Sequence, residues 1–296
     1  MFIRVKAPGS CGELIQGSID NEPFLVTCPI DVYSEVTITS NINNKLDIGE
    51  KSKLAINHTL KHLNIDTKFD YFIKLVSSLP EGKGMASSSA DISAICQAVA
   101  LSFNKVLTAD EISSIAASIE PTDGIFYEGI VKFNHITGRQ QEFLGNPPKL
   151  LIALFDIGGG IDTLSFNQRK DLQTLNRQKE KQVLEALTLV RKGIATNNIE
   201  LIGQGATISS IANQKILYKP CLEAMIKIAD ECGAVGVNIA HSGTIIGLLF
   251  DMHQLSELAK SLSLTQKRCP QLSFLRTAHL ISGGLKIEGD IDGKSI

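Results

Sequence analysis

Apolar residues form two patterns along the chain: short runs, and positions three or four residues apart. The two patterns alternate, and they predict strands and helices in alternation. Runs rich in apolar and β-branched residues predict strands over 1–6, 24–27, 32–39, 70–76, 150–155, 235–240, 245–250 and 275–281. Apolar positions three and four residues apart predict helices over 50–63, 180–191, 201–212 and 221–232, a long helix after residue 91, a shorter one after residue 108, and a last helix before the final strand. This interleaving favours a two-domain α+β or α/β protein.

The helix after residue 108 has the clearest ends. Thr108 is suited to cap its first turn, and Glu111 three residues later completes a capping box. Pro121 stops the helix, because the residue before a proline disfavours helical backbone. The sequence therefore predicts a short helix that ends at the polar segment Glu120-Pro121-Thr122-Asp123-Gly124.

A pair of prolines marks the best candidate for a domain boundary. Asn146-Pro147-Pro148 precedes a nearly continuous apolar strand. A chain of 296 residues has room for about two domains, at roughly 150 residues each. The sequence therefore predicts one domain over 1–147 and a second over 148–296.

The composition excludes several classes of protein. With 29 lysines and arginines against 31 aspartates and glutamates, the net charge is −2, so we expect neither nucleic acid nor an anionic membrane as a partner. The chain contains no apolar run of 18 residues and does not begin like a signal peptide. Six scattered cysteines without a CxxC motif are typical of free thiols in a reducing compartment, which predicts a cytoplasmic protein. No pattern indicates an oligomeric state.

The segment Pro-Glu-Gly-Lys-Gly-Met-Ala-Ser-Ser-Ser-Ala-Asp at 80–91 carries the strongest chemical signal. It lies between a predicted strand and a predicted helix. Its glycines permit close approach of a ligand to the backbone, and the free N–H groups at the start of a helix attract an anion. The segment lacks the GxxxxGK[ST] pattern of a Walker A loop. Composition alone fits a glycine-rich helix entry with serine caps equally well.

Two further segments gain meaning only in combination with the first. By itself, Ala-Pro-Gly-Ser-Cys-Gly-Glu-Leu-Ile-Gln-Gly at 7–17 favours a turn followed by a strand. Ala-His-Ser-Gly-Thr at 240–244 favours a hairpin turn between two apolar strands. In this order and separation, however, the three segments resemble the three motifs of the GHMP kinase superfamily, and the resemblance spans nearly the whole chain. Together with 120–124, the residues of these segments are similar to those of the L-threonine kinase branch of that superfamily.

The resemblance implies a fold and an activity. It implies an α+β fold with an N-terminal domain of the ribosomal-S5 type, a ferredoxin-like C-terminal domain and ATP bound between them. It also implies transfer of the γ-phosphoryl group of Mg-ATP to the hydroxyl of L-threonine. The product, O-phospho-L-threonine, would serve the synthesis of the cobalamin linker. Rival interpretations are a homoserine kinase, a decarboxylase of the diphosphomevalonate type, or a non-catalytic nucleotide sensor on the same fold.

The resemblance also assigns roles to residues. Asp123 matches an aspartate that accepts the proton of the acceptor hydroxyl or orients it, and Ser88 and Glu120 match a Mg²⁺ site. The residues expected around the ATP phosphates are Gly82, Lys83, Gly84, Met85, Ala86, Ser87, Ser88 and Ser89. The residues expected near the substrate are Ser10, Glu13, His241, Ser242 and Gly243, and segment 156–163 is expected to line the same pocket.

Simpler interpretations of several of these residues remain open at this stage. Asp123 also suits an ordinary turn, Glu120 a solvated helix end, and His241 a hydrogen-bonded structural role. One departure from the family pattern concerns Ser10, which stands where many members have a lysine that some use near the reacting phosphate. Lys83, which we assign as catalytic, or Lys6 could supply that charge instead.

Overall fold

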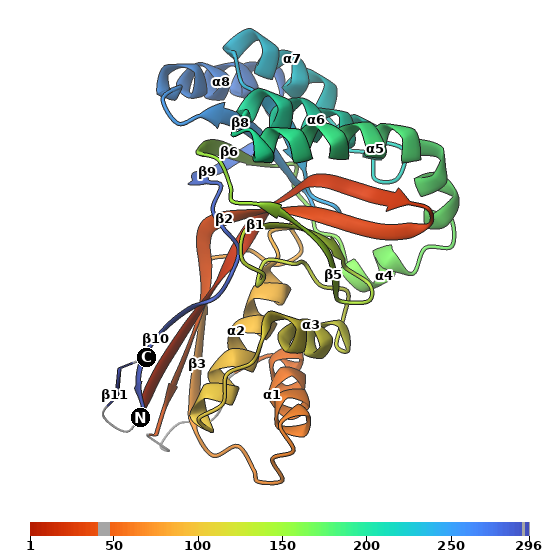
Figure 1. Ribbon diagram of the computed structural model, residues 1–296. Helices are drawn as coiled ribbons and strands as arrows, with labels where there is room; N and C mark the ends of the chain where they lie inside the picture. Colours follow the sequence, from red (N-terminus) through yellow and green to blue (C-terminus); the bar gives the residue numbers. More distant parts are fainter. Residues whose placement is uncertain (41–47, 292–293, 296) are drawn as a thin grey trace.

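A long β-hairpin runs through the middle of the computed structural model, which describes residues 1–40, 48–291 and 294–295 (Figure 1). The hairpin consists of β1 (Phe2–Ile19) and β2 (Glu22–Thr39). Asp20 and Asn21 both have positive φ, as the two central residues of a type I′ turn require. The proline and glycines of 7–17 do not interrupt β1. The register shifts there instead, between Pro8 and Gly9 and on either side of Glu13.

One sheet is built around this hairpin, and all of its strand pairs are antiparallel. Along its main path the strand order is β5-β4-β2-β1-β7-β8-β6-β9, while β3 pairs with β2 and β10 with β1 near the start of the chain. The remaining strands are β3 (Phe72–Ser77), β4 (Ile130–Asn134), β5 (Arg139–Gly145), β6 (Leu150–Asp156), β7 (Gly236–Ile239), β8 (Ile245–Asp251), β9 (Ser273–His279), β10 (Lys286–Ile291) and β11 (Lys294–Ser295). Because β10 pairs with β1, the two ends of the chain lie side by side (Figure 1).

Three helices pack beside the end of the hairpin that lies away from its turn (Figure 1). They are α1 (Glu50–His62), α2 (Ser87–Ser102) and α3 (Ala109–Ala117). Helix α2 is buried on almost every side because it lies between the sheet and the other two helices. The capping box predicted for α3 is confirmed: Thr108 and Glu111 cap each other's backbone N–H groups.

The second half of the chain adds five helices to the other end of the hairpin (Figure 1). They are α4 (Thr163–Asn167), α5 (Leu172–Ala195), α6 (Ile199–Asn213), α7 (Leu222–Cys232) and α8 (Leu255–Arg268). Helices α5 and α6 pack on β1, and α7 lies over a separate apolar cluster against β7 and β8. Among the helices of the described residues, none has the length and apolar composition of a membrane span.

The pattern of apolar residues predicts most of these elements but misses five of them. It does not predict strands β4, β5, β10 and β11 or the short α4, and α5 begins at Leu172 rather than at residue 180. Of the first two turns of α5, Lys179 is the residue that is buried, so an apolar period is lacking there. The larger core cluster contains residues from both halves of the chain, and the boundary between 147 and 148 stays a prediction.

Candidate active site

The three motifs meet through their backbones. The N–H groups of Ser10 and Gly12 donate to the carbonyl oxygens of Met85 and Gly84 at 3.0 and 3.3 Å. From the other side, the N–H groups of Thr244 and Ile245 donate to the carbonyl oxygen of Lys83 at 2.8 and 3.2 Å. The first and third motifs therefore hold the glycine-rich loop between them.

Two glycines make this close approach possible. A Cβ atom on Gly84, whose φ is +80°, would lie 2.3 Å from the Cβ of Ala240. A Cβ atom on Gly243 would lie 2.2 Å from the carbonyl oxygen of Lys83. Any side chain at either position would push the third motif away from the loop.

The loop forms one wall of a cavity of about 670 Å³. The lining residues are Leu25, Leu75, His135, Asn167 and the residues of 49–52, 81–82, 84–89, 91–92, 120–123, 160–163 and 241–242. The cavity thus brings together most of the residues that the sequence assigned to ATP, metal and substrate. Residues 160–163 line it as well, as expected for the segment that follows β6.

Helix α2 presents its N-terminus to this cavity. Its cap residue, Ala86, has left-handed backbone angles and provides no side-chain hydrogen bond. The first N–H groups of a helix have no partner within the helix, and its dipole favours an anion there. With Ser87, Ser88 and Ser89 in the first turn, this end of α2 is suited to phosphate oxygens.

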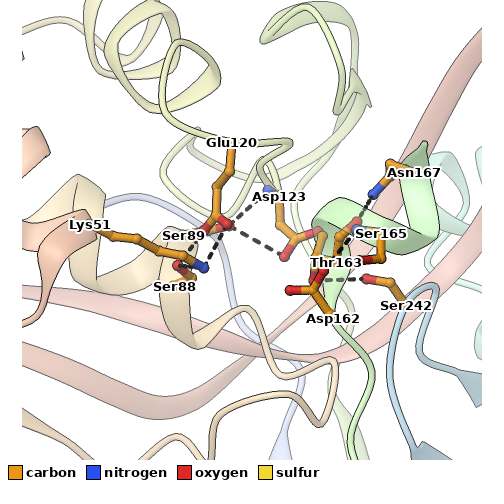
Figure 2. Close-up of polar contacts among 10 residues, drawn as sticks. All are labelled: Lys51, Ser88, Ser89, Glu120, Asp123, Asp162, Thr163, Ser165, Asn167 and Ser242. Carbon is orange, nitrogen blue, oxygen red and sulfur yellow. Dashed lines mark hydrogen bonds and ion pairs between the residues drawn. The ribbon is translucent and has the colours of Figure 1, made fainter.

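A lysine, a serine and a glutamate form a compact cluster beside the loop (Figure 2). The Ser88 hydroxyl donates to the Glu120 carboxylate. The Lys51 Nζ lies 2.7 Å from Glu120 Oε2 and donates to Ser88 Oγ at 3.3 Å. Glu120 is only 5% exposed, so a cation is already needed to balance its charge. A solvated glutamate at the helix end is therefore not what the structure shows.

Asp123 lies next to this cluster and contacts the first turn of α2. Its backbone N–H donates to Ser89 Oγ at 3.0 Å, and that hydroxyl lies 3.4 Å from Asp123 Oδ2 (Figure 2). Burial and the neighbouring charge of Glu120 raise the pKa of Asp123 to about 6. A carboxyl group with such a pKa is largely ionised at neutral pH and is a better proton acceptor than an ordinary aspartate.

A second buried carboxyl group, Glu13, approaches Asp123 from β1. Burial, followed by the negative charge of Asp123, raises the pKa of Glu13 well above its ordinary value. Among the described residues, its Oε2 atom has no hydrogen-bond partner. Glu13 itself does not line the cavity, and in the sheet it pairs with Ile239 of β7.

His241 reaches the cavity from the third motif. Its Nδ1 atom lies 3.0 Å from Gln16 Oε1, and Gln16 Nε2 donates to the carbonyl oxygen of Ile239. The amide orientation of Gln16 thus places the His241 proton on Nδ1. The rings of His135 and His241 are 5.0 Å apart, and burial lowers the pKa of both, that of His135 to about 4.

Three other predicted site residues lie outside the cavity lining. The Lys83 ammonium lies 2.7 Å from Asp156 Oδ2 and donates to the carbonyl oxygen of Gly159 at 2.6 Å. Ser10 is buried and contacts the loop through its backbone, and Gly243 packs against the loop from behind. The catalytic role of Lys83 and the substrate roles of Ser10 and Gly243 stay predictions.

Lys51 and His135 are among the lining residues that sequence reasoning missed. Neither belongs to a motif. Lys51 is in the first turn of α1 and His135 follows β4, so both reach the cavity only through the packing of distant elements. Sequence spacing contains no signal for such a contact.

Comparison with known proteins identifies the family. Residues 50–126 match the N-terminal domain of GHMP kinases. The chain is 31% identical to an L-threonine kinase of Salmonella typhimurium, over 96% of this chain and 95% of the relative. It is 30% identical to an L-threonine kinase of Citrobacter freundii, over 96% and 99%. The chain belongs to the GHMP kinase family. It is therefore an ATP-dependent phosphotransferase.

The architecture of this GHMP kinase agrees with the family. A crystal structure of mevalonate kinase superposes with a TM-score of 0.69 at 18% identity, covering 95% of this chain and 99% of that one. The predicted α+β fold of the GHMP kinase type is thereby confirmed.

Proposed function

We propose that this GHMP kinase transfers the γ-phosphoryl group of Mg-ATP to the side-chain hydroxyl of L-threonine. The observation that carries the proposal is the position of Asp123. Its carboxyl group, with a raised pKa, lies in the same cavity as the phosphate-binding loop and contacts the first turn of α2. The choice of L-threonine is supported by the two L-threonine kinases that match nearly the full chain.

In the proposed reaction, the threonine oxygen attacks the γ-phosphorus while Asp123 accepts the hydroxyl proton. The bond between the γ-phosphorus and the oxygen bridging to the β-phosphate breaks, and ADP leaves with that electron pair. The N-terminus of α2 holds the phosphates in place through the N–H groups of Ser87, Ser88 and Ser89. Catalysis thus depends mainly on positioning and on stabilisation of charge.

Ser88 and Glu120 fit a magnesium ion. Their oxygens are in contact, Glu120 is buried, and the Lys51 ammonium lies against both, so the pair already holds a cation. Mg²⁺ prefers one or two protein oxygens plus phosphates and water. When bound there, Mg²⁺ would neutralise charge on the phosphates. Ser88→Ala should raise the Mg²⁺ concentration needed for half-maximal activity, whereas Ser102→Ala, at the far end of α2, should not. Equal requirements would remove Ser88 from the metal site.

ADP release over a panel of acceptors tests the proposal. The panel contains L-threonine, L-serine, L-homoserine, mevalonate and galactose, each at saturating Mg-ATP. We expect L-threonine to give the highest kcat/KM. A higher value for another acceptor would overturn the assignment of L-threonine as substrate and leave the assignment as a kinase intact. Nucleotide binding without ADP release from any acceptor would favour a nucleotide sensor.

The proposal extends to the cellular role. We infer a cytoplasmic enzyme, which is supported by six cysteines that are all free thiols. We also infer that O-phospho-L-threonine serves the synthesis of the cobalamin linker, on the strength of the sequence resemblance alone. Radiolabelled threonine fed to cells with and without the gene would test this role through label in cobalamin.

A further inference from the structure

The cavity contains an unusual balance of charge for a protein that binds ATP. The acidic side chains that line it are Glu50, Glu81, Asp91, Glu120, Asp123 and Asp162. Among the described residues of the lining, Lys51 is the one lysine, and arginine is absent. Both lining histidines have lowered pKa values, so they are neutral at pH 7. Lys51 is therefore the side-chain cation available to a phosphate group there.

The two lysines considered from the sequence are engaged elsewhere. The Lys83 ammonium pairs with Asp156 at 2.7 Å, and Lys83 is not part of the cavity lining. Lys6 lies in β1 opposite β10, where its ammonium pairs with Glu288 at 3.3 Å and with Glu35 at 3.7 Å. Neither, therefore, takes the place of the first-motif lysine that Ser10 lacks.

We propose that Lys51 is a catalytic residue, whose ammonium contacts the transferred γ-phosphoryl group. Its Nζ lies between Glu120 and Ser88, on the side of the phosphate-binding loop where Asp123 also lies (Figure 2). Its side chain is half exposed, so its flexible stem is free to turn the ammonium from Glu120 toward a phosphate. This inference rests on the proposed phosphoryl transfer.

The role of Lys51 in that transfer is electrostatic. As the γ-phosphorus moves from ADP to the acceptor oxygen, negative charge is shared among the phosphoryl oxygens and the leaving oxygen. The Lys51 ammonium donates hydrogen bonds to these oxygens and keeps its protons throughout, while Asp123 takes the hydroxyl proton. Six carboxylates in the lining would otherwise repel the phosphates, so this charge has a large effect on the reaction.

Steady-state kinetics with L-threonine and Mg-ATP provide the first test. Lys51→Met should lower kcat by about 10²–10³-fold, as removal of one preorganised donor at developing charge does in other enzymes. Lys51→Arg should restore part of that loss. Lys53→Met is the matched control. Lys53 lies two residues after Lys51 on α1 and outside the cavity lining, and its ammonium is 2.6 Å from Glu50. A kcat within threefold of the native enzyme in Lys51→Met would overturn the proposal.

A binding measurement separates a phosphate contact from a purely structural role. Lys51→Met should weaken Mg-ATP at least tenfold more than Mg-ADP, because ADP lacks the phosphoryl group that Lys51 contacts. Equal weakening of both nucleotides would show that Lys51 only anchors Glu120, and would overturn the proposal. The comparison needs no acceptor, so it decides the role of Lys51 even if the panel of acceptors shows that L-threonine is wrong. Circular dichroism checks that each variant is folded.

Discussion

At the scale of single residues, the coupling between Asp123 and its neighbours determines how the site responds to pH. Glu120 is buried on one side of Asp123, and the charge of Asp123 in turn raises the pKa of Glu13 behind it. Three carboxyl groups so close together do not all ionise easily. Lys51 offsets the charge of Glu120, which leaves Asp123 ionised at neutral pH, with a pKa of about 6.

We predict a pH profile that follows Asp123. Because the proton acceptor must be ionised, kcat/KM should rise as pH increases through about 6 and should fall tenfold per pH unit well below it. Asp123→Asn should lower kcat by about 10²-fold or more and should abolish this acidic limb. The variant should fold, because asparagine also suits the turn at 121–124.

Initial rates of the native enzyme and of Asp123→Asn between pH 5 and 8 test this prediction. A folded variant with near-native kcat would assign Asp123 to an ordinary structural turn. An acidic limb that persists unchanged in the variant would assign the titration to another group.

The motifs place some of the predicted site residues in the cavity and others outside it. Ser88, Glu120 and Asp123 all line one cavity, whereas Ser10, Lys83 and Gly243 lie outside its lining although they also belong to motifs. Lys51 lies in an ordinary amphipathic helix with no unusual neighbours in sequence. Its contact with Glu120 depends on how α1 and the end of α3 pack, which no local pattern encodes.

At the scale of elements, the site depends on the contact between the phosphate-binding loop and the third motif. We predict that Gly243→Ala lowers the free energy of unfolding by about 1–3 kcal/mol, the usual cost of overpacking. The added Cβ would lie 2.2–2.3 Å from backbone atoms of Lys83 and Gly84, which must shift. Because the loop moves with them, Mg-ATP should also bind more weakly.

Urea unfolding and nucleotide titration measure both effects. Gly160→Ala is the control for stability, since its Cβ would meet no atom closer than 3.7 Å. If Gly243→Ala and Gly160→Ala have the same stability, the close contact between loop and third motif is incorrect.

Two buried lysines donate hydrogen bonds to the first and third motifs. Lys179 of α5 donates to Gln16 O and to Asn213 Oδ1, and Lys219 donates to Gly243 O at 2.5 Å. Burial lowers the pKa of each to about 7. Both lysines are almost fully buried, at 3% and 1% exposed, without an ion pair among the described residues, which is costly when they are charged.

We predict that stability rises between pH 7 and 9 because of these lysines. In that range the unfolded chain retains lysine protons that the folded chain releases, because an unfolded lysine has a pKa near 10.4. The free energy of unfolding should therefore increase by up to about 1.4 kcal/mol per pH unit for each lysine. Lys179→Met should reduce this slope in urea unfolding, whereas Lys181→Met, exposed on the same helix, should keep it. Identical slopes in both variants would contradict the assignment.

The sequence predicts elements where apolar periodicity is strong and misses them where it is weak. Helix α3 and its capping box follow directly from Thr108, Glu111 and the apolar face between them. Strand β5 is mostly polar and partly exposed, and the first turns of α5 are polar, so neither shows a period. Glycine and proline in 7–17 indicate a turn, but bulges in β1 accommodate them within one strand.

At the scale of the whole molecule, β1 connects everything that the site requires. Its first half pairs with β10 from the end of the chain, and its second half carries the first motif and contacts α5 and α6. Glu13 pairs with Ile239 at the point where the sheet passes from the N-terminal to the C-terminal half of the sequence. Residues from both halves line the cavity, and the strands of both halves belong to a single sheet (Figure 1).

Selection of the acceptor is the property of this assembled cavity that matters most to its proposed function. We predict that L-threonine is preferred to L-serine by roughly 10–200-fold in kcat/KM, because the two differ by one methyl group and a fitted apolar contact with such a group is worth about 1–3 kcal/mol. Serine should be a poor substrate rather than an inert one. Mevalonate and galactose lack the ammonium group of an amino acid, so buried polar partners of that group would be left unsatisfied and the loss should be far larger. Values of kcat/KM at saturating Mg-ATP measure the order. A serine value equal to that of threonine would mean that the cavity has no pocket for the methyl group, and a mevalonate or galactose value above threonine would reject an amino acid as the acceptor.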